Sequence, residues 1–263
     1  MIGISWYFGF EIEPEERVKL LKKYGFDCVI TNADKKFNKQ NGTIKNQIKL
    51  FNKYEIKLSS LHMRYNSVDL PHFWLDDKCG KMLEKNLIRD VKLAHKYKFS
   101  CVVVHLRARK YTKIGEERLK RVLKICTKLN VDLAIENLCN NYEVFEKVFK
   151  NINHRNLKFC YDAGHHNIWM KEIDFLEKYG DKLIALHLHS NKGTYDNHTL
   201  SKYGNIDWDK IAEKLAKLPR VNLDYELLMV YKPKNITAER VLEECMKEAK
   251  FLQDRIAYYR NAK

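Results

Sequence analysis

The sequence predicts an α/β protein, a (β/α)8 TIM barrel with a closed parallel sheet. Its length of 263 residues matches the usual size of such a barrel and lies near the upper limit for one hydrophobic core. Short apolar segments alternate with segments of helical periodicity along the whole chain. With only 4 prolines and no low-complexity tract, nothing marks a linker, so residues 1–263 are expected to form a single domain.

The expected strands are short apolar runs bounded by turn residues. They are residues 2–8, 27–31, 57–61, 101–104, 131–135, 157–162, 183–188 and 221–225. In the sixth run, Leu157, Phe159 and Tyr161 alternate with the other residues, as the twofold period of a strand requires. Asp162 falls where this strand should stop, and Gly164 is expected to supply a turn.

The expected helices lie between these strands and after the last one. They are residues 14–24, 43–54, 80–97, 116–129, 142–149, 173–179, 207–218 and 238–258. Pro14 suits the start of the first helix, where Glu15 and Glu16 favour the N-terminal dipole, and Gly25 ends it. The stretch between the third strand and the third helix is expected to be a long loop.

A doubly wound open sheet is the alternative architecture. It should carry a glycine-rich phosphate turn after its first strand, and Gly3 and Gly9 do not form that pattern.

Composition limits the class of protein. No run of 18 apolar residues and no signal pattern is present, so no membrane partner is expected. The 7 cysteines are scattered and never in a Cys-x-x-Cys pair, which predicts buried free thiols in a reducing, cytoplasmic setting. The net charge of +15 would suit nucleic acid, but the basic residues are spread throughout, as an AT-rich genome would also produce.

Six consecutive expected strands end on residues that can bind a metal ion. In chain order these are His62, His105, Glu136, Asp162, His189 and Glu226. In a barrel the carboxyl ends of all strands meet at one mouth, where active sites lie. Carboxylates and imidazoles without thiolates suit zinc, manganese, cobalt or magnesium. Each residue alone has a plainer explanation, a helix-capping carboxylate or a hydrogen-bonded histidine under a loop.

Three further residues lie near the seventh strand. His187 shares the inward-facing parity of His189 and is expected to lie deeper and to orient a ligand, or to serve as an alternative ligand. Asp196 and His198, two residues apart on the following loop, can add a second set of ligands or belong to a solvated loop.

Several motifs together resemble the xylose-isomerase-like barrel superfamily. They are residues 61–65 (LHMRY), 103–105 (VVH), 134–138 (AIENL), 160–165 (CYDAGH), 186–191 (LHLHSN), 204–208 (GNIDW) and 225–226 (YE). The resemblance covers about residues 25–226. The superfamily includes sugar and sugar-phosphate isomerases and epimerases as well as the endonuclease IV class of abasic-site nucleases.

The resemblance implies two possible sets of ligands. In the epimerase branch, one metal ion would be held by Glu136, Asp162, His189 and Glu226, with His165 contacting substrate and the two glutamates acting as acid and base. In the nuclease branch, three zinc ions would be held by nine residues, namely His62, His105, Glu136, Asp162, His165, His189, Asp196, His198 and Glu226.

The chain departs from the superfamily pattern at several positions. Residues 138–141 replace a glycine-rich segment of the nucleases, and residues 106–107 replace their Pro-Gly. Lys192 stands where an acidic residue usually follows the asparagine, and residues 201–202 stand where proline and a small or apolar residue are usual. The first two departures favour the epimerase branch.

The resulting expectation is an isomerase or epimerase that depends on one to three divalent metal ions and moves a proton beside a metal-held carbonyl of a sugar or sugar phosphate. The alternatives are an abasic-site endonuclease, the one case with DNA as partner, and a sugar-binding barrel without turnover. A substrate anion is expected to meet lysines on the last two barrel loops, Lys192, Lys202 and Lys232 among them. Tyr65, Phe73 and Trp74 are expected to wall the pocket.

Overall fold

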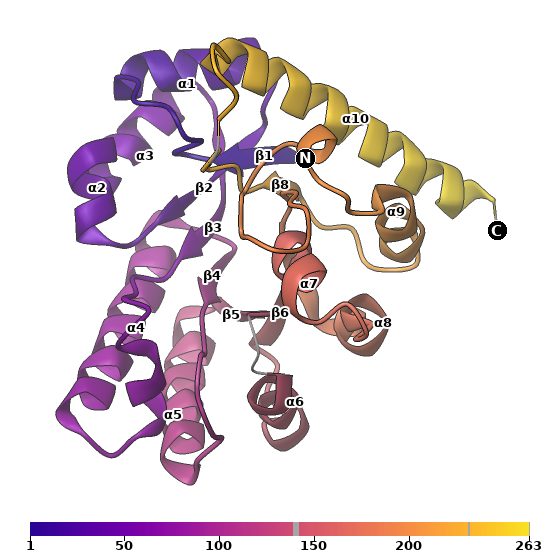
Figure 1. Cartoon of the computed structure of the whole chain (residues 1–263). Helices are drawn as coiled ribbons and strands as arrows, with labels where there is room; N and C mark the ends of the chain where they lie inside the picture. The colour runs from indigo at the N-terminus through magenta and orange to yellow at the C-terminus, as the bar shows by residue number, and fades with distance from the viewer. Residues whose placement is uncertain (139–141, 231, 263) are drawn as a thin grey trace.

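The computed structural model describes residues 1–138, 142–230 and 232–262. Within them, all strands form one parallel sheet in the order β7-β6-β5-β4-β3-β2-β1-β8. The two ends of this sheet meet, because Leu188 pairs with Tyr225 and its amide donates a hydrogen bond of 2.9 Å to the carbonyl of Asp224. The predicted (β/α)8 barrel is therefore confirmed, and Figure 1 shows the helices arranged around the strands. Cys139 and the rest of residues 139–141 lie outside the described residues.

The strands are short and begin and end close to the predicted positions. They are β1 (Ile2–Ser5), β2 (Cys28–Asn32), β3 (Lys57–His62), β4 (Cys101–Val104), β5 (Asp132–Glu136), β6 (Leu157–Asp162), β7 (Leu183–His187) and β8 (Leu223–Tyr225). The first strand ends three residues earlier than predicted. Trp6 and Phe8, which were expected in it, are fully buried in the core, and the Trp6 indole donates to the carbonyl of Asn41 at 2.8 Å.

The helices include two that the sequence did not predict. The described set is α1 (Pro14–Lys23), α2 (Lys35–Asn41), α3 (Ile44–Lys53), α4 (Lys78–Tyr97), α5 (Lys113–Leu129), α6 (Tyr142–Asn151), α7 (Ala163–Trp169), α8 (Phe175–Tyr179), α9 (Trp208–Ala216) and α10 (Ala238–Asn261). The unpredicted α2 and α7 each follow an aspartate that caps them, Asp34 and Asp162. Where Gly164 was expected to form a turn, the chain enters α7 directly.

The alternation of β6 separates two apolar layers. Phe159 points outward, and its ring lies within 6.5 Å of the rings of Phe145, Phe149 and Phe175 from the covering helices. On the opposite face, Cys160 packs inside the barrel with small side chains, Cys101, Val103, Ala134 and Ala185. The barrel interior below the mouth is therefore filled by small residues, and the polar side chains lie above them at the strand ends. Among the described residues, no helix is long and apolar enough to cross a membrane.

Candidate metal centre

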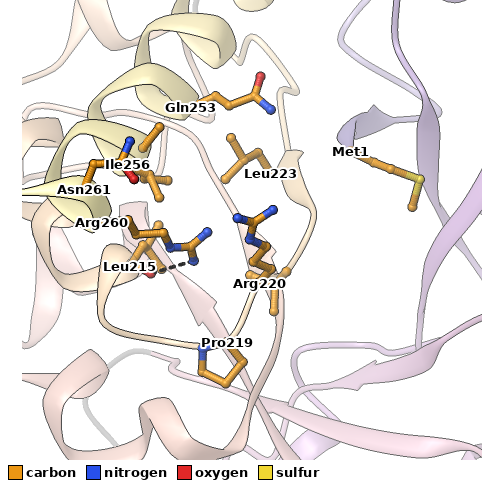
Figure 2. Close-up of a pocket in the computed structure, with 11 residues that line it drawn as sticks. Met1, Leu215, Pro219, Arg220, Leu223, Gln253, Ile256, Arg260 and Asn261 are labelled. Carbon is orange, nitrogen blue, oxygen red and sulfur yellow. Dashed lines mark hydrogen bonds between the residues drawn. The ribbon is translucent and has the colours of Figure 1, made fainter.

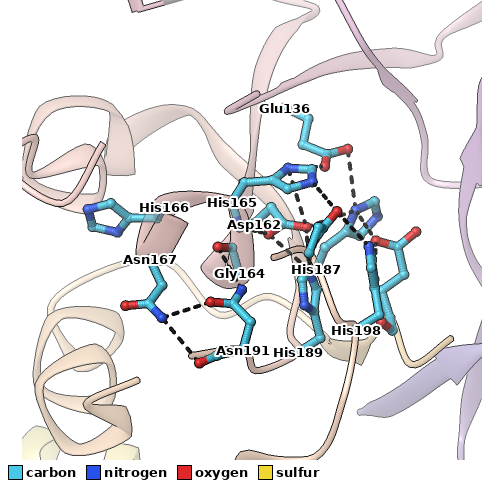
Figure 3. A network of polar contacts seen from close by, with 12 residues as sticks. Glu136, Asp162, Gly164, His165, His166, Asn167, His187, His189, Asn191 and His198 are labelled. Carbon is cyan, nitrogen blue, oxygen red and sulfur yellow. Dashed lines mark hydrogen bonds and ion pairs between the residues drawn. The ribbon is translucent and has the colours of Figure 1, made fainter. Parts of the chain in front are cut away.

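The barrel register brings the strand-end side chains of β3 to β8 together at one mouth. His62, His105, Glu136, Asp162 and His189 are all less than 9% exposed. Such burial is unusual for carboxylates unless they are paired or bind a cation. Figure 3 shows several of these side chains converging from separate strands and from α7.

Glu136, at the end of β5, makes the largest number of these contacts. Its Oε2 lies 3.0 Å from Nε2 of His105, 3.3 Å from Nδ1 of His187 and 3.7 Å from Nε2 of His62. Its Oε1 lies 3.0 Å from Nδ1 of His165. One carboxylate therefore contacts imidazoles from four different segments of the chain.

Asp162, at the end of β6, caps α7 and also lies among the candidate metal ligands. Its Oδ1 accepts a hydrogen bond of 2.6 Å from the backbone amide of His165, which caps α7. The same carboxylate lies 3.2 Å from Nε2 of His189. A helix cap and a candidate metal ligand are thus compatible, because a carboxylate has enough lone pairs for both.

The loop carrying Asp196 and His198 folds over the mouth and joins the cluster. Oδ2 of Asp196 lies 3.1 Å from Nε2 of His198 and 3.3 Å from Nε2 of His165. The ring of His198 stacks on that of His189 with centroids 3.8 Å apart, and its Nδ1 donates to the carbonyl of Glu226 at 2.9 Å. These contacts are specific enough to exclude a merely solvated loop.

Two asparagines that the sequence analysis did not assign hold the centre in place. Asn137 accepts from the amide of Asp162 at 2.7 Å and donates to its carbonyl at 2.9 Å. Asn191 donates to the carbonyl of Gly164 at 3.0 Å. Both are fully buried. The sequence feature that could have identified them is their position directly after strand-end residues, in the motifs AIENL and LHLHSN.

Several buried polar atoms of the centre have no hydrogen-bond partner. They are Oε1 of Glu136, Nδ1 of His165, both ring nitrogens of His187, Nδ1 of His189 and Oδ1 of Asp196. Glu136 Oε1 and His165 Nδ1 face each other at 3.0 Å, too poorly aligned for a hydrogen bond. Unpaired buried polar atoms are costly, and a cation shared between donors removes that cost.

The donor atoms form groups of the size that a metal ion needs. Three ligand atoms lie within 4.8 Å of one another in each group, which are His62–His105–Glu136, Glu136–Asp162–His165, His165–Asp196–His198, His189–His198–Glu226 and Glu136–Cys160–His187. The predicted set of Glu136, Asp162, His189 and Glu226 is spread over overlapping groups. The residues present therefore fit one or more divalent cations with oxygen and nitrogen ligands.

The charges of the centre are strongly coupled. Burial raises the pKa of Glu136, but His105 and His187 outweigh it and hold this pKa well below its usual value. Burial lowers the pKa of His198, yet Asp196 beside it contributes to a net rise to about 9. These shifts favour an ionised Glu136 and a protonated His198. A divalent cation competes for the same carboxylates and would displace those protons.

His187, the last residue of β7, contacts both glutamates. It is 1% exposed, and its Nδ1 is 3.3 Å from Oε2 of Glu136 and 3.2 Å from Oε2 of Glu226. The two glutamate carboxylates thus meet at one imidazole nitrogen.

The predicted pocket wall is only partly where it was expected. The Tyr65 ring lies 4.6 Å from the ring of His105, and burial near the glutamates raises its pKa to about 12. Phe73 and Trp74 instead lie in a short 3-10 helix (Leu70–Trp74) packed against α4 and α5, with Trp74 1% exposed and in ring contact with Tyr111. Their large apolar rings are buried in the core between those helices, so Tyr65 alone of the three borders the centre.

The predicted anion-binding lysines also differ in their surroundings. Lys202 pairs with Glu244 at 3.3 Å, and Lys232 donates to the carbonyl of Gly9. Lys192 has no ion pair among the described residues and lines a depression of about 590 Å³ together with Lys202. Of these three lysines, Lys192 is therefore the one best able to contact a substrate anion.

A separate cavity of about 340 Å³ lies at the other end of the barrel. Met1, before β1, and residues leading into β8 line it, so it opens at the amino ends of the strands (Figure 2). Arg220 and Arg260 both line it, and Arg260 is held by the carbonyls of α9 and the loop after it. No carboxylate–imidazole group lies in its lining, so it is separate from the metal centre.

Gly164 gives a direct test of the geometry. A Cβ atom there would lie 1.9 Å from Cε1 of His189, so Gly164→Ala should push this imidazole away and lower metal affinity by at least tenfold. Gly115→Ala is the matched control, because its Cβ would meet the Trp74 ring at 2.1 Å. That variant should lose about 1–3 kcal/mol of stability without a change in metal affinity. Calorimetric titration with zinc and denaturant unfolding measure both quantities, and equal metal affinity in the two variants would contradict the assignment.

The fold is a (β/α)8 barrel, and a buried cluster of carboxylates and imidazoles that could hold a metal ion lies at its mouth. The chain belongs to the xylose isomerase-like TIM barrel family, whose model matches residues 18–228.

Known relatives are similar over parts of the chain. The sequence is 35% identical over 111 residues to the uncharacterized protein y4fM of Sinorhizobium fredii, a match covering 40% of this chain and 36% of that protein. It is 25% identical over 190 residues to the uncharacterized protein MJ1614 of Methanocaldococcus jannaschii, covering 67% of this chain and 72% of that protein. The match to MJ1311 of the same organism covers 46% of that protein, so the chain aligns with less than half the length of y4fM and MJ1311.

Solved structures match almost the whole chain. A D-tagatose 3-epimerase-like protein superposes with a TM-score of 0.77 at 19% identity, covering 99% of this chain and 98% of that one. The D-psicose 3-epimerase of Clostridium cellulolyticum H10, solved with D-tagatose, gives a TM-score of 0.71 at 18% identity, covering 98% of both chains. An L-ribulose 3-epimerase gives 0.74 at 15% identity, covering 99% and 96%. At these identities the similarity shows a shared fold.

Proposed function

We propose that the protein is a divalent-metal-dependent isomerase or epimerase of a sugar or sugar phosphate. The observation that carries the proposal is the meeting of Glu136 and Glu226 at Nδ1 of His187, in a buried centre that also contains Asp162 and His189. Two carboxylates at the ends of different strands, beside a candidate cation site, are what a proton transfer at a sugar carbon requires. The reaction class named for the epimerases of the same fold supports this choice.

The residues divide the chemistry between them. When bound, a divalent cation supplies a positive charge that polarises the substrate carbonyl. Glu136 and Glu226 act as acid and base on the carbon beside that carbonyl, one removing the proton and the other returning it. The side chain of His165 is 6% exposed and lies between Glu136 and Asp196, which supports its role as a hydrogen-bond partner of a substrate hydroxyl. Tyr65 covers His62 and His105 and limits the access of water.

The test is solvent isotope exchange. Protein stripped of metal and reloaded with manganese, cobalt, zinc or magnesium is incubated with D-psicose, D-tagatose or L-ribulose in deuterated water. We expect deuterium uptake at one carbon and formation of the epimer only when a metal is present. Tight sugar binding without uptake would instead indicate a barrel that binds sugar without turnover.

An abasic-site nuclease is the second candidate, favoured by the additional groups His62–His105–Glu136 and His165–Asp196–His198. These provide ligands for more than one ion, as a multi-zinc site needs. Incision of a duplex carrying one abasic site, at low salt with added zinc, tests it. Robust incision that His105→Ala and His198→Ala each abolish would replace the isomerase proposal. We expect no incision.

Lys192 is proposed to steer a phosphorylated substrate. The Lys192→Ala variant should raise KM for a sugar phosphate about fivefold, the effect of losing one exposed charge pair, while KM for the unphosphorylated sugar stays the same. Lys202→Ala is the matched control, because its ammonium group already pairs with Glu244 at 3.3 Å. Steady-state kinetics on both sugar forms measure the effect. Equal KM values for the two forms in the unmodified protein would contradict an anion subsite here.

A further inference from the structure

Cys160 lies in the barrel interior directly below the metal centre. It shares the inward face of β6 with Asp162, two residues further on, and it pairs in register with Glu136 of the neighbouring β5. In the next strand pair, Asp162 is in register with His187 of β7. The strand register therefore sets one thiol beside a carboxylate and an imidazole of the centre.

The three side chains form a compact and fully enclosed group. One ligand atom each from Glu136, Cys160 and His187 lies within 4.8 Å of the other two, and the three residues are at most 2% exposed. Both ring nitrogens of His187 are buried and lack a hydrogen-bond partner. Figure 3 shows His187 inside the network of carboxylates and imidazoles rather than at its edge.

The spacing suits a tetrahedral ion. His187 Nδ1 and Glu136 Oε2 are 3.3 Å apart. Zinc bonds of about 2.0–2.1 Å at tetrahedral angles separate two ligand atoms by about 3.3 Å. The charge also suits it, because a thiolate and a carboxylate together neutralise a buried dication, which would otherwise be costly to desolvate.

We propose that Glu136, Cys160 and His187 form an inner metal site that takes a thiophilic divalent ion such as zinc or cobalt. Binding forms a metal–sulfur bond, and the thiol proton leaves to solvent. Glu136 belongs to both this inner site and the outer groups, so it would be a ligand shared by the two sites. The thiolate favours zinc and cobalt over magnesium and manganese, which prefer oxygen ligands.

The other interior thiols have different neighbours. Cys28 donates to Oδ1 of Asp224 at 3.6 Å, and Cys101 lies beside the hydroxyl of Ser100 at 3.9 Å. Neither belongs to one of the ligand groups named above. Cys101, on β4 in the same interior layer as Cys160, is therefore a matched control.

Cobalt(II) titration of chelator-stripped protein tests the inner site. A cobalt–thiolate bond gives an intense near-ultraviolet charge-transfer band, which oxygen and nitrogen ligands alone do not give. We expect this band to grow to saturation in the unmodified protein and in Cys101→Ser, and to disappear in Cys160→Ser and Cys160→Ala. Elemental analysis after zinc loading should find one ion fewer per chain in the Cys160 variants.

Two of the results that would overturn the inference come from the unmodified protein and do not depend on the folding of the variants. Cobalt uptake without the band, no cobalt uptake, or a band that persists in a folded Cys160→Ser protein would each overturn it. The inference rests on the proposed metal-dependent function through the shared Glu136, yet the two can fail separately. Metal-dependent deuterium exchange together with cobalt uptake that gives no thiolate band would leave the epimerase proposal standing and remove the inner site.

Discussion

Glu226→Gln and Glu136→Gln are each expected to lower kcat for epimerisation by roughly 10³-fold, since general acid–base catalysis contributes effects of that size. A glutamine amide has nearly the shape of the carboxylate but cannot accept the proton. Each variant also replaces an anionic candidate ligand beside His187 with a neutral one, so metal affinity should fall together with turnover.

Isotope exchange separates loss of a base from loss of the metal. At saturating metal, a variant with one remaining base should still exchange the proton that this base removes from one epimer, while interconversion of the two epimers stops. Glu248→Gln is the matched control, because Glu248 lies on α10 and accepts from the amide of Ser201 at 3.0 Å. Unchanged metal content in an Asp162→Ala, Glu226→Gln double variant would contradict the assignment of both as ligands.

The barrel and the convergence of its strand ends could be predicted because both follow from local sequence patterns. Short apolar strands give the parallel sheet, and a residue at the end of a strand such as Glu136 or Asp162 must then lie at the mouth. His187 could be assigned to the interior by the same period of two. His189 lies two residues beyond β7, yet it keeps the predicted direction because Leu188 pairs with Tyr225 of β8.

Other features depend on contacts between segments far apart in the chain, and these could not be predicted from the sequence. Trp74 follows a strand-end loop, as a pocket residue would, but the absence of a side chain at Gly115 makes room for its ring against α5. Lys232 was expected to face substrate, whereas the carbonyl of Gly9, far away in the sequence, accepts from it. The approach of Cys160 to His187 likewise depends on the stagger between β6 and β7, where the register shifts between Phe159 and Cys160.

Removal of metal should have the second large effect, on stability as well as on activity. The centre gathers the carboxylates of Glu136, Asp162, Asp196 and Glu226 within contact of a few shared imidazoles. An ion that binds only the folded protein stabilises it by about 4 kcal/mol at a free concentration 1,000 times Kd. For a chain of this length that corresponds to a fall in Tm of roughly 10 °C after chelation.

Differential scanning calorimetry before and after chelation measures this shift, and readdition of zinc, cobalt, manganese or magnesium should restore both Tm and turnover. His189→Ala should abolish most of the metal-dependent shift, because its Nε2 contacts Asp162 at 3.2 Å in the centre. His154 lies outside the centre, and its Nε2 is 3.3 Å from the hydroxyl of Thr127. The His154→Ala variant should therefore keep the full metal-dependent shift in Tm. A Tm that chelation leaves unchanged in protein shown by elemental analysis to have lost its metal would mean that the carboxylates are already balanced by protonated imidazoles, and that the cation contributes to chemistry but not to folding.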